Sequence, residues 1–133
     1  MSQENVECVR RILRAFNDGD AEALVAECDP GVEWEEQSIP GVDPIFRGHD
    51  GVRRWAELVM GQELGSLEAR IERMEEADDA VIASIFVEGE GSSSGVRVQM
   101  HVHLVLTLRA GKLARRQVFQ TLAEARTAAG LRE

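Results

Sequence analysis

Residues 96–109 read VRVQMHVHLVLTLR. The side chains at every second position, from Val96 to Leu108, are apolar, and most of those between them are polar. Successive side chains of a β-strand point to opposite faces of the sheet, so this alternation predicts one long strand with an apolar and a polar face. We expect the apolar row to face inward against a layer of helices and to leave a cavity there.

Shorter patterns predict the strands around this one. Apolar side chains alternate or cluster in four further stretches, at residues 32–37, 67–74, 80–88 and 113–119. The glycine- and serine-rich segment 89–95 is typical of a hairpin loop, and residues 110–111 are typical of a turn. Because short connections join most of these strands, we expect a mainly antiparallel sheet.

Two helical patterns precede the first strand. Apolar residues recur at spacings of three and four over residues 6–16, and a second helical face consists of Leu24, Val25 and Cys28. Asp20 is expected to cap the second helix, and residues 29–31, which read DPG, are expected to end it.

Two more helices flank the remaining strands. Asp50 is expected to cap a third helix over residues 50–60, and Thr121 forms a capping box with Glu124 at the start of a short final helix that Gly130 ends. Residues 38–48 contain two prolines and two glycines, so we expect a loop that covers the interior.

This order of elements predicts an α+β fold. We expect three N-terminal helices packed in the concave face of a curved, mainly antiparallel sheet, which makes a cone-shaped α+β barrel, and a short C-terminal helix. The chain is expected to form a single domain over residues 1–133.

Composition argues against several classes of partner. The formal net charge is -9, which repels phosphate backbones and anionic lipids, so we expect no nucleic acid and no membrane partner. No uninterrupted apolar segment opens the chain, and a cytoplasmic location is therefore expected. Cys8 and Cys28 are expected to be buried, inert thiols, and the sequence contains no metal or cofactor motif.

Several short motifs together resemble a known family. They are NDGD at 17–20, DPGVEW at 29–34, FRG at 46–48 before GVR at 51–53, and LRAGKL at 108–113. In this order they resemble the SnoaL-like branch of the nuclear transport factor 2-like superfamily. The resemblance implies a cone of helices against a curved sheet, a pocket for a small hydrophobic molecule and frequent homodimers. It does not select one function, because the group holds isomerases, cyclases, hydrolases, dehydratases and proteins that only bind.

Glu35 is the candidate catalytic residue. The resemblance to ketosteroid isomerase aligns Glu35 with that family's carboxylate base. An alignment shifted by one residue would match a neighbouring residue instead. A carboxylate at the mouth of an apolar cavity loses hydration and becomes able to transfer protons near neutral pH. Alternatively, the acidic residues here form the wet side of an edge strand. Trp34 points the other way from Glu35, so only one of the two can line the cavity.

Ketosteroid isomerisation itself is not expected. The chain has no tyrosine, and Ile12 stands at the position that resembles the family's oxyanion tyrosine. The family's partner acid on the long strand is replaced in the region 102–104, so an enolate would lack both neutral donors. Thr121 stands where many relatives have an Asp, which argues against acid–base chemistry at the end of the last strand.

The remaining candidates are ligand-binding residues. In the enzymes that the chain resembles, the alternate set Arg116, Val118 and Gln120 lines the pocket, and we expect Trp55 and Met100 to line it as well. Arg116 would either hold an anionic group or pair with Glu35, or instead lie outward beside Arg115.

His101 and His103 leave the same face of one strand and could share a metal ion, but no third ligand is evident. They lie on the polar face, so solvent or a dimer interface is the expected environment.

Two functional hypotheses follow. In the first, the chain is an isomerase, cyclase or hydrolase for a small hydrophobic substrate, with Glu35 as proton acceptor. In the second, it is a non-catalytic binding or dimerisation module whose pocket is filled by its own side chains. A void of roughly 300 Å³ or more, and the facing of Glu35 and Arg116, would distinguish them.

Overall fold

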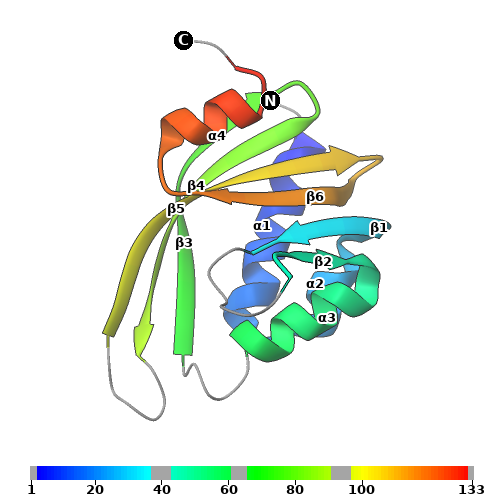
Figure 1. The fold of residues 1–133 in the computed structure, drawn as a ribbon, viewed down its shortest axis with the longest axis vertical. Helices are drawn as coiled ribbons and strands as arrows, with labels where there is room; N and C mark the ends of the chain where they lie inside the picture. Colours follow the sequence, from blue (N-terminus) through cyan, green and yellow to red (C-terminus); the bar gives the residue numbers. More distant parts are fainter. Residues whose placement is uncertain (1–2, 37–42, 61–65, 91–96, 132–133) are drawn as a thin grey trace.

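A computed structural model describes residues 3–36, 43–60, 66–90 and 97–131 (Figure 1). In chain order the elements are α1 (Gln3–Asp18), α2 (Ala21–Ala26), β1 (Cys28–Glu35), β2 (Ile45–Arg47), α3 (Gly48–Val59), β3 (Ser66–Ala77), β4 (Ala80–Glu90), β5 (Arg97–Arg109), β6 (Lys112–Phe119) and α4 (Leu122–Ala128). The predicted α+β class and the short C-terminal helix are therefore confirmed.

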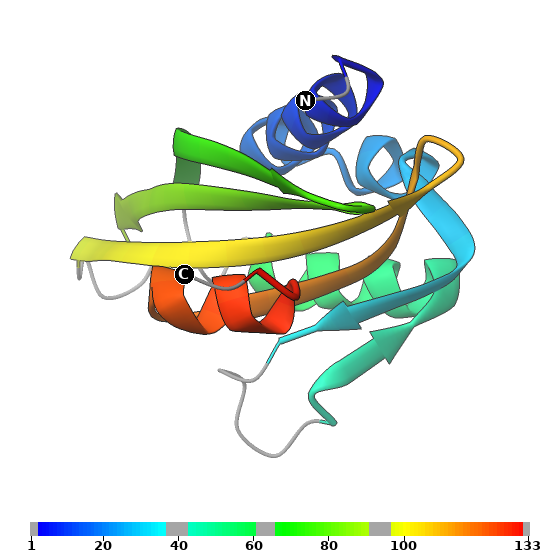
Figure 2. The ribbon, with the colours of Figure 1, turned by 90° about the horizontal axis from the view of Figure 1, so that it is seen from above.

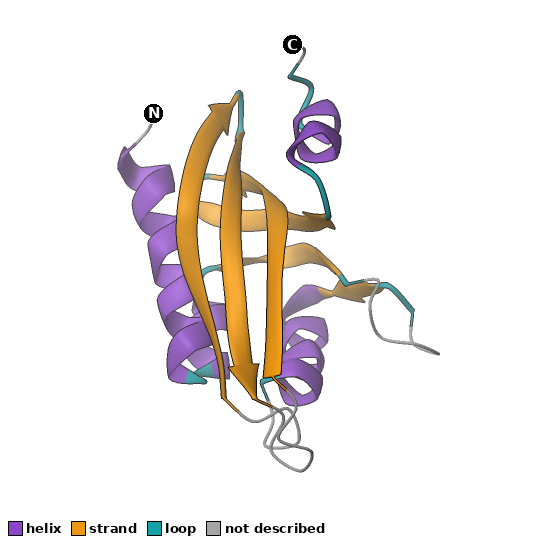
Figure 3. Ribbon diagram, turned by 90° about the vertical axis from the view of Figure 1, so that its left-hand side faces the viewer, coloured by secondary structure: helices purple, strands orange, loops and turns teal. Residues whose placement is uncertain are grey.

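The strands form one curved sheet in the order β2-β1-β6-β5-β4-β3. All neighbouring pairs are antiparallel except β1 and β6, which are parallel. Figure 2 shows α1 and α4 on opposite sides of the sheet, and in Figure 3 α4, beside the C-terminus, lies apart from the other helices. The main buried core contains side chains from α1, α2 and α3, whereas Ala125 of α4 belongs to a separate cluster. The first three helices thus fill the concave side, as expected.

The long strand behaves as its alternation predicts. Leu104, Leu106 and Leu108 belong to the main buried core together with side chains from the three concave-side helices. Val105, on the opposite face, is buried in a smaller cluster with Ala125 of α4. The convex face is therefore also covered where α4 packs on it. Val96, the first residue of the predicted row, lies outside the described residues.

Local sequence signals set the predicted helix ends. Asp20 caps α2, because its Oδ1 accepts a hydrogen bond from the backbone N of Ala23 at 3.0 Å. Thr121 caps α4 in the same way, with Oγ1 3.2 Å from the backbone N of Glu124. Gly130 follows α4 with a φ of +82°, a conformation that favours glycine.

Three boundaries differ from the predictions. α2 ends at Ala26, and Cys28 already begins β1, where it pairs with Leu113 of the distant strand β6. α3 begins at Gly48 rather than at an Asp50 cap, and Asp50 instead bonds to Arg53 within the first turn at 3.0 Å. In each case a long-range or side-chain contact outweighs the local signal.

The segment predicted as a covering loop contains a strand. β2 lies within residues 38–48 and pairs antiparallel with β1, where Trp34 opposes Phe46. Phe46 is 2% exposed, so core packing holds this short strand in place. Of the predicted loop, residues 38–42 lie outside the described residues.

The predicted burial of the two cysteines is confirmed. Both thiols are free and buried. Burial raises the pKa of Cys8 to about 11 and that of Cys28 to about 12, which leaves both protonated and unreactive near neutral pH. Within the described ranges, every helix is too short or too polar to cross a membrane.

Candidate functional site

A cavity of about 450 Å³ lies between the concave face of the sheet and the helices. Its wall comes from α1, α2, α3 and all strands except β2, and nearly all of the described lining side chains are apolar. Glu36 and Arg116 are the charged side chains in the described lining. The polar chemistry of the cavity therefore depends on this pair.

Arg116 extends from β6 into the wall beside two tryptophan rings. The carbon Cζ of its guanidinium lies 4.6 Å from the ring centre of Trp34 and 5.1 Å from that of Trp55. Cation–π contacts of this kind stabilise a desolvated guanidinium. The register of the parallel pair places Trp34 directly opposite Arg116, so strand pairing alone brings the first of these rings into position.

The Arg116 side chain is only 10% exposed. Its Nη1 donates to the peptide oxygen of Glu35 at 2.6 Å and lies 3.7 Å from Oε1 of Glu36. Burial lowers the pKa of Arg116 from its ordinary value to about 10, and the carboxylates of Glu36 and Glu35 oppose this shift. The guanidinium nevertheless stays charged at neutral pH, and the cavity wall contains a fixed positive charge.

Glu36 is held by a second donor. The indole Nε1 of Trp55 donates to Glu36 Oε1 at 3.1 Å, and the Glu36 side chain is 13% exposed. Trp55 in turn packs between Trp34, with ring centres 4.7 Å apart, and Phe16, at 6.2 Å. Glu36 comes directly after β1 in the chain, but a residue of α3, Trp55, holds its carboxylate in position.

The indole N–H of Trp34 is the one buried side-chain donor without a hydrogen-bond partner among the described residues. Trp34 is 2% exposed and lines the cavity. An unsatisfied buried donor costs about 1–3 kcal/mol, so each one in a folded protein calls for a physical explanation.

Most of the predicted ligand-binding residues lie in the cavity wall. Arg116, Val118, Trp55 and Met100 all line it. Gln120 follows the end of β6, is exposed and does not belong to the described lining. The side chains of β6 that line the cavity therefore end at Val118, two residues before the predicted Gln120.

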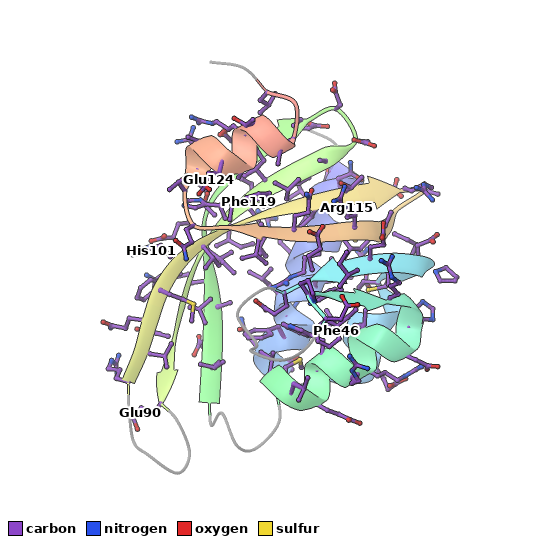
Figure 4. The ribbon with its side chains drawn as sticks, viewed as in Figure 1. Phe46, Glu90, His101, Arg115, Phe119 and Glu124 are labelled. Atoms are coloured by element: carbon purple, nitrogen blue, oxygen red, sulfur yellow. The ribbon has the colours of Figure 1, made fainter. Side chains whose placement is uncertain are left out.

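Glu35, the predicted catalytic residue, lies on the opposite face of β1. Its carboxylate accepts a hydrogen bond from Arg115 Nε at 3.0 Å, and Arg115 itself is outside the cavity lining (labelled in Figure 4). Of the two residues that could have lined the cavity, Trp34 therefore forms its wall and Glu35 points away from it. Glu36 lies on the same face as Val32 and Trp34, because every second side chain along a strand points the same way. This spacing in the sequence could have identified Glu36 as a cavity residue once Trp34 was placed in the wall.

The two strand histidines do not come together on a ligand. His103 Nδ1 is 2.7 Å from Ser84 Oγ, whereas His101 Nδ1 is 2.9 Å from Glu72 Oε1. The His101 ring is tilted against that of Phe86, with centres 4.7 Å apart. Both lie on the convex side, away from the cavity. Across the described ranges, no group of three His, Cys, Asp or Glu side chains is arranged to hold a metal ion.

Solved structures are similar to this chain over nearly its whole length. One, described as a SnoaL-like polyketide cyclase from Jannaschia sp. CCS1, has a TM-score of 0.77 and 19% identity, with coverage of 100% of this chain and 98% of that one. TerC, crystallised with polyporic acid, has a TM-score of 0.77 and 21% identity, with coverage of 96% and 99%.

A third structure comes from Catenulispora acidiphila. This ketosteroid isomerase-like fold in complex with trimethylamine has a TM-score of 0.77 and 15% identity, with coverage of 95% of this chain and 94% of that one. Identities this low show a shared fold. No curated protein matches the chain. The SnoaL-like domain matches residues 9–116, and the chain therefore belongs to the SnoaL-like family.

Proposed function

We propose that this protein binds a small, mostly apolar carbonyl compound in the cavity and catalyses proton transfer on it. The observation that carries the proposal is the Glu36–Arg116 pair, which lies 3.7 Å apart in a wall that is otherwise nearly all apolar. Paired groups of opposite charge at a desolvated site are the usual equipment of acid–base catalysis.

Each member of the pair has a distinct part in the proposed reaction. The Glu36 carboxylate takes a proton from the carbon next to the substrate carbonyl, and the electron pair of that C–H bond moves onto the carbonyl oxygen as an enolate. Arg116 stabilises the developing negative charge, a contribution commonly worth about 3–4 kcal/mol for a well-placed donor. Return of the proton to another atom gives isomerisation, and attack of the enolate on a second carbonyl gives cyclisation.

This proposal moves the role expected of Glu35 to its neighbour. Glu35 bonds to Arg115 outside the cavity lining, whereas Glu36 lines the cavity. The similar structures support a pocket function in general terms, because one is described as a polyketide cyclase and another holds polyporic acid.

A second candidate function is ligand binding without catalysis. It is favoured by the hydrogen bond from Trp55 to Glu36 and by the neighbouring guanidinium, since both groups engage the same carboxylate oxygen, Oε1. In that case the pair only fixes the shape of the wall. A version in which the protein's own side chains fill the pocket has little support, because the cavity volume is about 450 Å³.

The fluorescence of the protein provides a direct binding assay. The chain has two tryptophans and no tyrosine. Both tryptophans, Trp34 and Trp55, line the cavity. Binding of 2-tetralone, a bicyclic ketone with exchangeable protons beside its carbonyl, is therefore expected to change the tryptophan emission. Val102→Phe, which adds bulk to the wall, should abolish the change. Gln99→Phe, on the other face of the same strand, should leave it intact.

Proton transfer is tested by hydrogen–deuterium exchange. In D₂O the protein should accelerate incorporation of deuterium beside the carbonyl of 2-tetralone, as followed by NMR. Glu36→Gln should remove the acceleration and retain binding, and the matched control Glu35→Gln should retain both. Binding without acceleration in the unmodified protein would establish the non-catalytic alternative, and absence of binding would refute both.

We also propose that the protein is a cytoplasmic homodimer. The convex face carries two partly exposed aromatic rings, Phe86 beside His101 and Phe119 opposite His103, which provide a contact surface. The two unpaired thiols suit a reducing compartment. Light scattering after size-exclusion chromatography should give twice the chain mass of 14.7 kDa, or 29.4 kDa. A mass of one chain at micromolar concentration would exclude the dimer.

A further inference from the structure

Two exposed apolar side chains lie in the wall of the cavity and define what we call its rim. Among the described residues, the exposed large hydrophobic side chains are Leu58 and Met100, each 43% exposed. Both line the cavity. Leu58 is near the end of α3 and Met100 is near the start of β5, and these two ends lie at the same end of the molecule, the lower one in Figure 1. Exposed apolar side chains in the wall of a cavity are available to contact the apolar part of a ligand.

The buried part of the wall, in contrast, contains polar hydrogen-bond donors. Arg116 is 8% exposed, and the only hydrogen bond that its side chain makes to a described residue is the one from Nη1 to the peptide oxygen of Glu35. A guanidinium has five N–H donors, so most of its donor capacity is left for an acceptor in the cavity. Trp34 adds an unpartnered indole N–H in the same wall.

The volume limits the size of the occupant. At about 30 Å³ for each non-hydrogen atom, the share of a water molecule in the liquid, 450 Å³ corresponds to roughly 15 such atoms. An elongated occupant of this size fills a cavity whose wall includes Arg116 as well as Leu58 and Met100. A much smaller occupant leaves the rim side chains exposed.

We infer that the ligands of this cavity are elongated amphipathic carbonyl compounds, bound with the oxygen-bearing end at Arg116 and the apolar end at Leu58 and Met100. This orientation rests on the proposed function, to which it adds the ligand class and the direction of entry. The polar end enters first, and the rim side chains close on the apolar tail and remove it from water.

A homologous series of 2-alkanones from six to twelve carbons tests the inference by titration of tryptophan emission. Affinity should rise about threefold to fourfold for each added methylene. In Leu58→Ser and Met100→Ser the rise should level off for the longest ketones, so that 2-dodecanone loses about tenfold and 2-hexanone is unaffected. The matched control Leu131→Ser, outside the cavity lining, should leave the whole series unchanged.

Three results would contradict the inference, and they separate it from the proposed function. If the rim variants weaken 2-hexanone and 2-dodecanone equally, the rim does not contact the tail. If 1-aminodecane binds as tightly as 2-decanone, the polar end is not selected by Arg116. In both cases a small-molecule pocket remains. If no ketone binds, the proposed function fails together with the inference.

Discussion

The guanidinium carbon of Arg116 lies 4.6 Å from the ring centre of Trp34, its partner residue across the parallel β1–β6 pair. This contact joins the two strands on the concave side, where neighbouring side chains are apolar. Two further groups surround the guanidinium. The ring centre of Trp55 lies 5.1 Å from its Cζ, and Oε1 of Glu36 lies 3.7 Å from its Nη1. The charge is therefore compensated on several sides without being solvated.

Loss of one member of the Glu36–Arg116 pair should destabilise the protein much more than loss of both. Arg116→Met leaves Glu36 largely buried without its cation, so unfolding free energy should fall by about 3 kcal/mol. The double variant Arg116→Met/Glu36→Gln should recover most of this loss. Urea denaturation of the four proteins in the cycle measures the coupling. Additive effects would mean that the two side chains do not interact.

The neighbouring pair on the convex side of β1 should contribute little. Glu35 accepts from Arg115, whose side chain is 48% exposed and therefore screened by solvent. Glu35→Gln should change the unfolding free energy by less than about 1 kcal/mol. A loss as large as that of Arg116→Met in the same urea experiment would show that Glu35 has a structural role that this geometry does not explain.

The edge of the sheet depends on one asparagine. β3 is an edge strand, and the Asn17 side chain donates to the Ala69 carbonyl at 2.9 Å and accepts from the Ala69 N–H at 2.7 Å. Asn17→Ala should lower the unfolding free energy by about 1–2 kcal/mol and speed hydrogen exchange at the Ala69 amide. Asn17→Asp, which keeps the acceptor and loses the donor, should protect that amide and lose the carbonyl contact. Unchanged exchange in Asn17→Ala would contradict this role.

A carboxylate on the convex face should make stability depend on pH. Arg126 on α4 bonds bidentately to Glu75, with Nη2–Oε2 at 2.7 Å and Nε–Oε1 at 2.8 Å, and these bonds lower the pKa of Glu75 below its ordinary value of 4.5. The folded state then binds the proton less readily than the unfolded state. The stabilisation is present above pH 4.5 and is lost as the pH falls through the lowered folded pKa.

Glu75→Gln isolates this effect. It should destabilise the protein by up to about 1 kcal/mol at pH 7, because the pair is partly exposed, and by much less at pH 3. Glu68→Gln, an exposed residue on the same strand, is the control. Thermal unfolding at the two pH values measures the difference, and an equal loss at both would refute the linkage.

The two thiols should be unreactive in the folded protein. Burial raises the pKa of Cys8 to about 11 and of Cys28 to about 12, so the thiolate fraction at pH 8 is well below that of an ordinary cysteine. Ellman's reagent should label neither thiol in buffer at pH 8 and both in 6 M guanidinium chloride. Rapid labelling of the native protein would show that this part of the core opens.

Much of the sheet could be predicted because its signal is local. The alternation in residues 97–109 places Leu104, Leu106 and Leu108 on one face whatever the neighbouring strands are. The caps at Asp20 and Thr121 were likewise visible, because each involves a backbone N–H three residues along the chain. In contrast, β2 exists only because its residues pair with β1 and bury Phe46, and neither partner is local.

By itself, the sequence determined the strand and helix faces, the grouping of Val32 with Trp34 opposite Glu33 and Glu35, and the inert thiols, since each depends on backbone periodicity or apolar character. Only the tertiary structure decided which face of β1 borders the cavity. The parallel register that sets Trp34 beside Arg116 turns Glu36 inward and Glu35 outward. A one-residue difference reverses a strand face, and only the contacts between distant strands select between the two arrangements.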